Sequence, residues 1–580
     1  AEAPVPAAAA APAEGPRRGI RPWQLGIVGA LLAAAVAAAV VLATGGGSTT
    51  SKEPSCAAHF PALIRDGFPE PPMRFSTGGV LDTTLSAAPA TIPIDGKPVQ
   101  VMEYDGSLPA PTLVLCPGDR LTVHLNNQLP LPTNLHVHGL HVSPAGNGDN
   151  VFVSIPPAQA FTYHYQLPAD HPAGAFWYHP HFHTLVQAET GAGLAGAIVV
   201  AGGLDNLLPK IPQRLIVIQG GKETPQPGFK AVIPGLKPGQ FPPPLPGPVE
   251  LLTNGAADPQ ALIRPGEIQR WRIFNATSER FLHLQMPGQT FEVLARDGNT
   301  LHSMLPQGSL LIGPGSRVEV LVRGGPPGSY PLTAIPFQQC FKNCFDPIQG
   351  IPDPGRATPL KTVLTMVSRG APVNEPMPAA PLANPVDLRG LPVAVHRTIF
   401  MVRQLSTTGP PTFPFNGHIF DPNRVDVVMK LGAVEEWTLE NPITRVHDEW
   451  HTFHIHTNPF QVMSVNGHAR SFVDYQDNVN LAPGSTVVIR MRPLDFTGKT
   501  VFHCHLTFHE DHGMLGVIDI EANPTPAQTN ADTVLRIGAP VDVASTVGPA
   551  ASASTASAFT LFCPLLASAA SRVSVALGGA

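Results

Sequence analysis

One pattern, repeated three times along the chain, constrains the fold more than any other sequence feature. Each copy begins with a turn near Tyr104, Asn254 or Asn416 and continues through a Gly-containing turn into an alternating strand that ends in Asn. The copies lie roughly 150 residues apart, about the size of one β-sandwich domain. With 67 Pro and 54 Gly around short apolar runs, the composition also favours all-β architecture. We therefore expect three similar β-sandwiches in succession.

Shifts in composition mark the limits of this repeated region. The start of the chain is rich in Ala and Pro, and its end is rich in Ala, Ser, Thr and Val; such low-complexity segments are expected to be disordered. The predicted order is a disordered cytoplasmic tail (1–24), a signal or membrane-anchor helix (25–44), a linker (45–75), three β-sandwich domains (76–204, 205–376 and 377–522) and a low-complexity tail (523–580).

The N-terminal hydrophobic run, Leu25–Ala43, predicts export. Its 19 residues carry no charge and follow Arg17, Arg18 and Arg21. A run of this length can cross a bilayer as a helix, and the preceding basic residues place the start of the chain in the cytoplasm. The Arg pair also suits a cleaved twin-arginine signal. Either alternative places the later domains in the periplasm or on the extracellular face, and the first would anchor them in the inner membrane through residues 25–43.

Three consecutive residues, His503, Cys504 and His505, are of types that commonly bind metal ions. Because alternate side chains of a β-strand point to opposite faces, the two histidines face one way and the cysteine faces the other. One strand can therefore serve two metal sites. Cys504 is followed by His509 and Met514 at intervals of five residues. Thiolate, imidazole and thioether are the donors expected of an electron-transfer copper site with a weak axial Met.

Histidines spaced two residues apart recur along the chain. The four pairs are His136 and His138, His179 and His181, His454 and His456, and His503 and His505. Both imidazoles of such a pair project from the same strand face, and together the pairs suit three metal ions. The nearby thiolate makes copper the simplest choice. His451 precedes His454 by an odd step and so faces the opposite side, where it supplies a second imidazole to the Cys504 site.

These motifs (His-x-His-Gly, His-x-His, His-x-x-His-x-His and His-Cys-His-x3-His-x4-Met) resemble those of the three-domain multicopper oxidases, which include laccases and bacterial copper-efflux oxidases. The resemblance covers roughly residues 80–522. It implies three consecutive cupredoxin-like Greek-key β-sandwiches and four copper ions: one type 1, one type 2 and a type 3 pair. The trinuclear cluster would lie between the first and third domains. Thr452 departs from the family pattern, which usually has Pro there.

The same resemblance assigns a role to each ligand position. Type 1 copper would be held by His451, Cys504, His509 and Met514; type 2 copper by His136 and His454; and the type 3 pair by His138, His179, His181, His456, His503 and His505. Met514 as the axial ligand predicts a low to moderate type 1 potential.

The implied reaction transfers single electrons from a reducing substrate at the type 1 site and reduces O2 to water at the trinuclear cluster. A phenolic or diphenolic, laccase-like donor is favoured, because the 11 Met of the chain do not form the Met-rich cluster of the copper-efflux members. Oxidation of cuprous or other metal ions is the alternative. A copper nitrite reductase and a non-enzymatic cupredoxin scaffold are more distant alternatives.

Two acidic residues next to the predicted ligands are candidate proton relays. Glu510 follows His509 directly, and Asp149 lies in the loop after Gly139. Reduction of O2 to water consumes protons, which a positioned carboxyl group can deliver. The related enzymes use carboxylates at similar places.

The remaining composition limits the partners of the chain. A formal net charge of -6 without basic blocks argues against nucleic acid as a partner, and we expect a monomer that meets only a reductant and O2. Among the other cysteines, Cys340 and Cys344 lie in a loop-like stretch. A local disulfide is one interpretation of this pair, and a metal site is the other.

Overall fold

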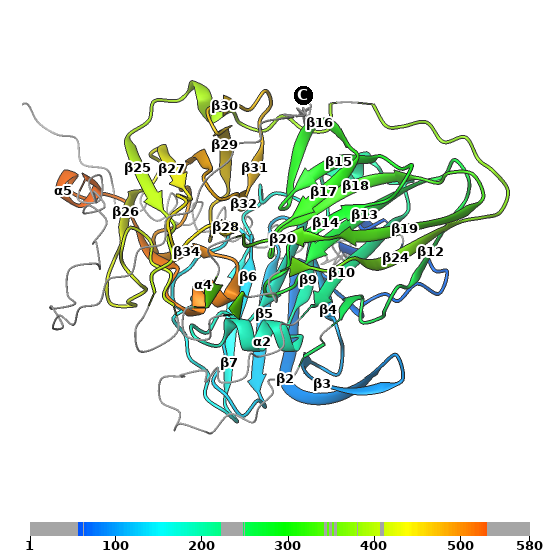
Figure 1. Cartoon of the computed structure of the whole chain (residues 1–580), viewed down its shortest axis with the longest axis horizontal. Coiled ribbons are helices and arrows are strands. Elements are labelled where there is room, and N and C mark those ends of the chain that lie inside the picture. Colours follow the sequence, from blue (N-terminus) through cyan, green and yellow to red (C-terminus); the bar gives the residue numbers. More distant parts are fainter. Residues whose placement is uncertain are drawn as a thin grey trace, which may run out of the picture. The chain divides into compact units, whose positions relative to one another are not determined.

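The computed structural model describes most of the globular part of the chain (Figure 1). The described residues are 56–61, 63–221, 247–248, 250–341, 345–346, 351–352, 357–379, 381–405 and 411–530. The predicted N-terminal helix (25–44) and most of the predicted C-terminal tail lie outside these ranges. None of the helices within them is long and apolar enough to cross a membrane.

Two sheets of the N-terminal third form the first sheet pair. One has the strand order β1 (Met73–Phe75), β4 (Ala110–Leu115), β9 (Gly196–Val200), β8 (Gly174–His179) and β6 (His136–His138); the other has the order β3 (Lys97–Tyr104), β2 (Val80–Ile94), β5 (Arg120–Asn127) and β7 (Ala160–Gln166). Apolar side chains of both sheets, such as Leu113, Val123 and Tyr163, form one core. Every residue of β4 and β8 is buried, so this sheet is covered on both faces.

The second sheet pair follows in the chain. Its six-stranded sheet has the order β11 (Leu251–Thr253), β10 (Gln213–Gly220), β13 (Ile268–Asn275), β18 (Arg317–Arg323), β15 (Phe291–Arg296) and β16 (Asn299–Gln307); its five-stranded sheet has the order β12 (Gln260–Ile263), β24 (Lys361–Ser368), β19 (Gly328–Ile335), β14 (Leu282–Gln285) and β17 (Ser309–Ile312). Trp271, Leu284 and Leu364 belong to the core between them.

The third sheet pair completes the described part. Its six-stranded sheet has the order β25 (Val395–Phe400), β27 (Glu435–Glu440), β33 (Thr486–Met491), β29 (Phe460–Val465) and β30 (His468–Ala469), with β31 (Tyr475–Gln476) also paired to β29; its five-stranded sheet has the order β26 (Val427–Lys430), β35 (Leu515–Glu521), β34 (Gly498–Cys504), β28 (His451–Ile455) and β32 (Asn478–Leu481). Trp437, Phe453 and Phe502 lie in its core. Three packed sheet pairs confirm the predicted all-β fold.

Short elements lie before, between and after the strands of these sheets. They are η1 (Cys56–Ala58), α2 (Val186–Ala192), α3 (Leu204–Leu207), β20 (Phe337–Gln338), β21 (Phe345–Asp346), β22 (Ile351–Pro352), β23 (Ala357–Thr358), η3 (Leu388–Gly390), α4 (Thr507–Asp511) and α5 (Pro526–Asn530). Helices α2 and α4, far apart in sequence, lie side by side (Figure 1). Asp511 of α4 accepts hydrogen bonds from the backbone N–H groups of Val186 and Gln187 at the start of α2, which joins the first sheet pair to the third.

The repeated turns have one backbone geometry. Asp105, Asn254 and Asn416 have φ values of 55, 49 and 51°, and each is followed by a Gly with φ of 74 to 84°. Two successive positive φ angles are those of a type I′ turn, in which Asp-Gly and Asn-Gly are favoured because they tolerate this backbone. The first part of each repeat is therefore a tight hairpin turn.

The Asn at the end of each repeated strand is buried and closes a loop. The side-chain amide of Asn127 donates to the carbonyls of Leu131 and Ile155, both at 2.8 Å. Asn275 and Asn441 each donate in the same way to two carbonyls of the following segments. Buried carbonyl groups need such partners, and this need explains why the repeat ends in Asn.

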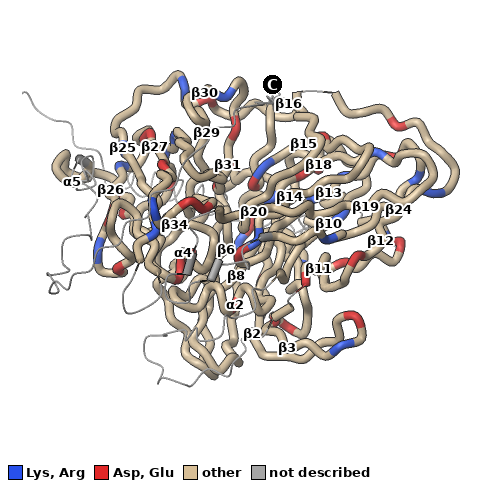
Figure 2. Tube along the Cα trace, viewed as in Figure 1, with Lys and Arg blue, Asp and Glu red and all other residues tan. Residues whose placement is uncertain are grey.

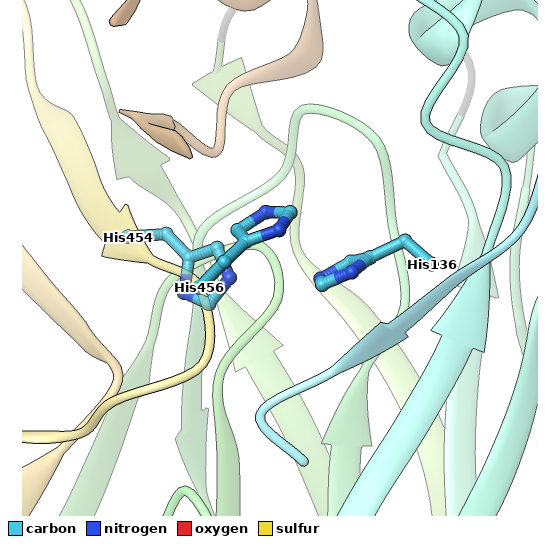
Figure 3. Close-up of side chains that lie close together, drawn as sticks. All are labelled: His136, His454 and His456. Carbon is cyan, nitrogen blue, oxygen red and sulfur yellow. The ribbon is translucent and has the colours of Figure 1, made fainter. Parts of the chain in front are cut away.

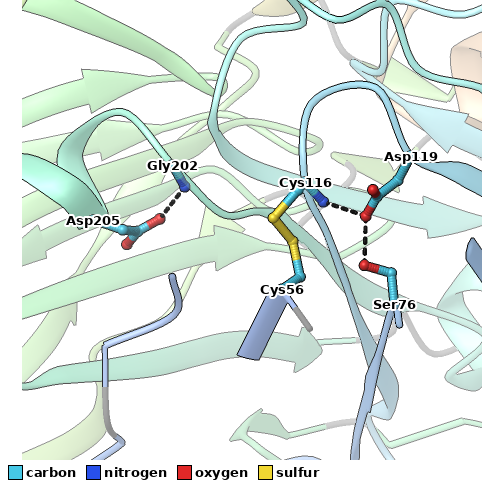
Figure 4. The surroundings of a disulfide bond; sticks show 6 residues. All are labelled: Cys56, Ser76, Cys116, Asp119, Gly202 and Asp205. Carbon is cyan, nitrogen blue, oxygen red and sulfur yellow. Dashed lines mark hydrogen bonds between the residues drawn. A yellow bond between two sulfur atoms is a disulfide. The ribbon is translucent and has the colours of Figure 1, made fainter. Parts of the chain in front are cut away.

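Disulfides are present in the described part. Cys56 and Cys116 are bonded, with their Cα atoms 5.8 Å apart, and the bond ties the start of the described chain to the end of β4 (Figure 4). Asp119 lies beside it and accepts hydrogen bonds from the Ser76 hydroxyl and from the backbone N–H of Cys116. Cys340 is also disulfide-bonded, but Cys344 lies outside the described residues, so the predicted local pairing stays a prediction.

Charged residues are sparse along the trace (Figure 2), yet several arginines lie inside the protein. Arg214, Arg270, Arg272 and Arg317 are among the largest fully buried side chains. Each forms ion pairs with buried or half-buried carboxylates, as buried charges require. Removing one partner of such a pair leaves an uncompensated charge and is strongly destabilising.

Candidate metal centre

The His-Cys-His segment ends the inner strand β34. In the antiparallel register of β28 and β34, Phe453 lies opposite Cys504 and His454 lies opposite His503. Directly opposed residues of neighbouring strands point to the same face of the sheet. His454 and His503 therefore share one face, while Cys504 points to the other. The structure brings the predicted ligands together in two groups, one on each face.

The first group is a cluster of eight histidines, all at most 2% exposed. They are His136, His138, His179, His181, His454, His456, His503 and His505. His136 projects from β6 of the first sheet pair, whereas His454 and His456 come from β28 and the loop after it (Figure 3). The cluster thus lies between the first and third sheet pairs.

Several ring nitrogens of this cluster lie about 3 Å from one another. His503 Nε2 lies 3.1 Å from His181 Nε2 and 3.2 Å from His456 Nε2. His505 Nε2 lies 3.2 Å from His138 Nδ1. Two nitrogens that each lie about 2.0 Å from one ion are about 3 Å apart. These distances therefore suit two metal ions, one between the first three rings and one beside His138 and His505.

The unpartnered nitrogens of the cluster also fit bound ions. Within the described residues, His136 Nε2, His179 Nε2 and His454 Nε2 are buried and have no hydrogen-bond partner. Such orphaned buried groups are costly unless a ligand or ion meets them. His136, His454 and His456 also have ligand atoms within 4.8 Å of one another.

Burial keeps most imidazoles of the cluster neutral. It is the largest cause that lowers the pKa values of His136, His138, His179, His181, His454, His503 and His505, and neighbouring imidazoles of the cluster lower most of them further. The pKa of His179 falls to about 3. A metal ion binds only the neutral ring, so the cluster stands ready to bind metal at neutral pH.

The second group lies on the other face of β34. His451 Nδ1 and His509 Nδ1 lie 3.3 and 3.6 Å from Cys504 Sγ and 3.2 Å from each other. Helix α4 turns the chain back and brings His509 to the site. Met514 is buried in the same core, and its backbone carbonyl accepts from the Cys504 N–H at 3.0 Å. Phe413 stacks on the His509 ring with centroids 4.1 Å apart.

The chemistry of this donor set indicates a soft ion. Burial raises the pKa of the Cys504 thiol, so the protein alone would keep it protonated. A bound cation changes this balance, because coordination deprotonates a thiol outright. Thiolate, two imidazoles and a nearby thioether fit copper.

The two predicted acidic residues contact imidazoles of the cluster. Both carboxylate oxygens of Asp149 lie 2.9 Å from His136 Nδ1. Glu510 Oε2 lies 3.1 Å from His503 Nδ1, and its other oxygen lies 3.4 Å from His181 Nδ1. Burial raises the pKa of Glu510 to about 7. Each carboxyl group meets the ring nitrogen that points away from the centre of the cluster, and such contacts fix the orientation of a ligand.

A third acidic residue, Asp477, was not predicted from the sequence. Its Oδ1 lies 3.2 Å from His138 Nε2, and its backbone carbonyl lies 2.7 Å from His454 Nδ1. Arg317 of β18 donates two hydrogen bonds to the carboxylate, at 2.7 and 2.6 Å. No short spacing links Asp477 to the histidines or to Arg317, so only the tertiary structure reveals it.

The Gly of the first motif is explained by this ion pair. Gly139 follows His138 with φ of 83°, and a Cβ atom there would lie 2.3 Å from Asp477 and 2.4 Å from Arg317. Both the positive φ and the close approach favour Gly. The His-x-His-Gly motif therefore makes room for residues that come from the second and third sheet pairs.

Comparison with known proteins agrees with this geometry. Three family models, each described as multicopper oxidase, match residues 86–204, 174–347 and 396–524. Together they span more than half of the chain, and they include every residue of both groups. The chain belongs to the multicopper oxidase family. Membership implies an oxidoreductase that binds copper and uses a reductant and O2.

Individual relatives share low sequence identity with the chain but align with most of its length. A multicopper oxidase mco of Staphylococcus haemolyticus is 26% identical over 436 residues, which cover 72% of this chain and 83% of the relative. A cell division protein FtsP of Shigella dysenteriae is 27% identical over 388 residues, which cover 64% of this chain and 74% of the relative. The solved structure of a Campylobacter jejuni multicopper oxidase, described as a metallo-oxidase, is 23% identical with a TM-score of 0.62 and covers 80% of this chain and 98% of that one. This structural likeness confirms the cupredoxin-like fold.

Proposed function

We propose that the chain is an oxidase that takes single electrons from a reducing substrate at the Cys504 site and reduces O2 to water at the histidine cluster. The observation that carries this proposal is that the predicted ligands form two buried groups on opposite faces of one strand. Cys504 is bonded through the backbone to His503 and His505, so a single residue step joins the two groups.

The proposed ligand assignment follows the nitrogen positions. His136 and His454, with their unpartnered Nε2 atoms, would hold type 2 copper. His181, His456 and His503 would hold one type 3 copper, and the remaining three histidines, His138, His179 and His505, would hold the other. His451, Cys504, His509 and Met514 would hold type 1 copper. When bound, the four copper ions supply one-electron acceptance and O2 reduction.

Two carboxyl groups of the chain can hold protons beside the histidine cluster. The histidines of the cluster are buried, so side chains that reach the cluster can carry protons to it. Glu510 contacts His503 and His181, and Asp149 contacts His136. We assign both carboxyl groups as proton relays because each lies within or near hydrogen-bond reach of a ring in the cluster.

Replacing Glu510 with Gln tests this assignment. The amide is similar in size but cannot release a carboxyl proton, so we expect the rate of O2 uptake to fall about 100-fold, within the usual range for general acid–base catalysis. The blue absorption band of the type 1 site should stay unchanged, because the Glu510 carboxyl group faces His503 and His181 of the cluster rather than the Cys504 site. Glu436→Gln, at a half-buried surface ion pair with Arg490, is the matched control. A wild-type rate in Glu510→Gln would remove Glu510 from the mechanism.

A phenolic or diphenolic donor is the substrate class that we propose first. Met residues are few in the sequence and do not form a Met-rich cluster there, which disfavours capture of cuprous ions. A metal-ion substrate is the second candidate. The Campylobacter jejuni relative is described as a metallo-oxidase, which fits this second candidate.

One experiment separates the enzyme from its alternatives. The protein is loaded with copper, and copper content, blue absorption and O2 consumption are measured with a diphenol, with Cu(I) and with Fe(II). We expect close to four copper ions per chain, an intense blue band and O2 uptake. Failure to retain copper would favour a scaffold role, a role compatible with the similarity to a cell division protein. Nitrite reduction without O2 uptake would favour a nitrite reductase.

We also propose that the protein acts outside the cytoplasm as a monomer. The Cys56–Cys116 bond supports export, because disulfides persist mainly in oxidising compartments. Anchoring through residues 25–43 stays a proposal, because this segment lies outside the described residues.

A further inference from the structure

His447 forms a hydrogen-bonded link to one imidazole of the Cys504 site. It lies four residues before His451, and both rings are fully buried. His447 Nε2 lies 2.8 Å from His451 Nε2. On its other side, His447 Nδ1 lies 2.9 Å from the backbone carbonyl of Pro442. The two rings and the carbonyl thus form a short chain that ends at the metal-facing nitrogen of His451.

The carbonyl determines where the hydrogen atoms of this chain lie. A carbonyl oxygen can only accept, so the Nδ1 of His447 carries a hydrogen atom and donates it. The Nε2 of neutral His447 is then bare and accepts from the Nε2–H of His451. This arrangement leaves the Nδ1 of His451 with a free electron pair, and that nitrogen is the one that faces Cys504 Sγ at 3.3 Å.

The segment that carries His447 is held from both sides. Asn441, which ends the repeated strand of the third copy, donates to the carbonyl of Glu449 at 2.9 Å. The backbone N–H of Trp450 donates to the carbonyl of Gln339 at 2.8 Å, and Gln339 belongs to the second sheet pair's segment after β20. The position of His447 is therefore fixed by packing between two sheet pairs.

We propose that His447 is a positioning residue that fixes the tautomer and orientation of His451 as a type 1 ligand and denies reducing substrates contact with that imidazole. The proposal rests on the proposed function, since it assigns a ligand role to His451. The other imidazole of the site differs, because His509 Nε2 faces the carboxylate of Glu449 at 3.4 Å. A reducing substrate is therefore kept from the Nε2 edge of His451, which the His447 ring covers.

The test compares variants that keep or remove the acceptor for His451. His447→Leu removes it, and we expect about a 10-fold to 100-fold weaker affinity for Cu(I) at the type 1 site, the usual effect of losing such a supporting contact. The blue band and the type 1 potential should shift with it. His447→Gln can place an amide oxygen where Nε2 was, and it should restore affinity, band and potential to near wild-type values. His447→Met takes the place of the Leu variant if that variant does not fold.

The measurements are Cu(I) competition with a chelator, absorption spectroscopy and redox titration of the copper-loaded protein. His283→Leu is the matched control, because His283 bonds Ser309 in the second sheet pair and should leave all three values unchanged. A blue wild type with a Leu or Met variant that matches it in affinity, band and potential would overturn this inference alone. A wild type without a blue band would overturn the proposed function and this inference with it.

Discussion

Replacing Cys504 with Ser is expected to abolish the blue absorption band and to lower O2 uptake more than about 100-fold. The band requires a thiolate bound to copper, and a hydroxyl group is a poor substitute for this soft ligand. Loss of a supporting contact alone costs about 10-fold to 100-fold in metal affinity or activity, and loss of a ligand should cost at least as much. Copper analysis should show one ion fewer per chain.

The fold should survive this change. Ser is close to Cys in size, and Cys504 is the only free cysteine among the described residues, so its replacement disturbs no disulfide. Met514→Leu is the matched control within the same core. That variant keeps the thiolate and both imidazoles, so the blue band should stay while the type 1 potential rises through loss of the axial thioether. A Cys504→Ser protein that remains blue would contradict the assignment of the site.

Replacing Arg317 with Leu is expected to lower the free energy of unfolding by about 3–5 kcal/mol, the usual cost of breaking a buried ion pair by removing one partner. Its guanidinium donates to the carboxylate of Asp477 through two nitrogens and also to the carbonyl of Ala175 at 3.1 Å. The residue lies on β18 of the second sheet pair, and its partners belong to the third and first. Hydrogen bonds of this one side chain thus link the second sheet pair to the first and to the third.

The same change should weaken metal binding by the histidine cluster. Asp477 also contacts His138, so loss of Arg317 frees a carboxylate that orients a ligand, and we expect about a 10-fold fall in copper affinity of the cluster. Chemical denaturation and copper titration measure the two effects. Arg397→Leu is the control, because Arg397 pairs with buried Glu435 within the third sheet pair. The control should lose stability but keep its copper affinity. Equal copper loss in both variants would show that the effect is general destabilisation.

Most of the ligand set could be predicted from the sequence, because strand geometry acts locally. Two residues at i and i+2 share a face in any strand, so the pairing of His454 with His456 and the opposite orientation of His451 required only the spacing. The alternation at Cys504 likewise required only that β34 be a strand. The repeated turns and the terminal Asn residues were visible for the same reason, since each satisfies a local backbone requirement.

The supporting residues could not be predicted in this way. Asp477, Arg317 and His447 are single polar residues without a repeated spacing, and the roles of Asp477 and Arg317 arise from contacts between different sheet pairs. His447 is near His451 in sequence, yet its role depends on the carbonyl of Pro442 and on the packing of the loop. The limits of the three domains and the fate of the N-terminal helix stay predictions.

The resemblance of the histidine and cysteine motifs indicated the family. Residue type and strand periodicity were sufficient to predict the all-β fold and the candidate ligands, because these follow from patterns within short stretches of chain. The tertiary structure was needed to show which ring nitrogens face one another, which carboxylates contact the imidazoles, and that the His447 ring contacts the Nε2 atom of His451. Most of these features depend on distances between segments that are far apart in the sequence, whereas the contact of His447 with His451 depends on the fold of one loop. Such distances are set by the packing of the sheet pairs rather than by any local pattern.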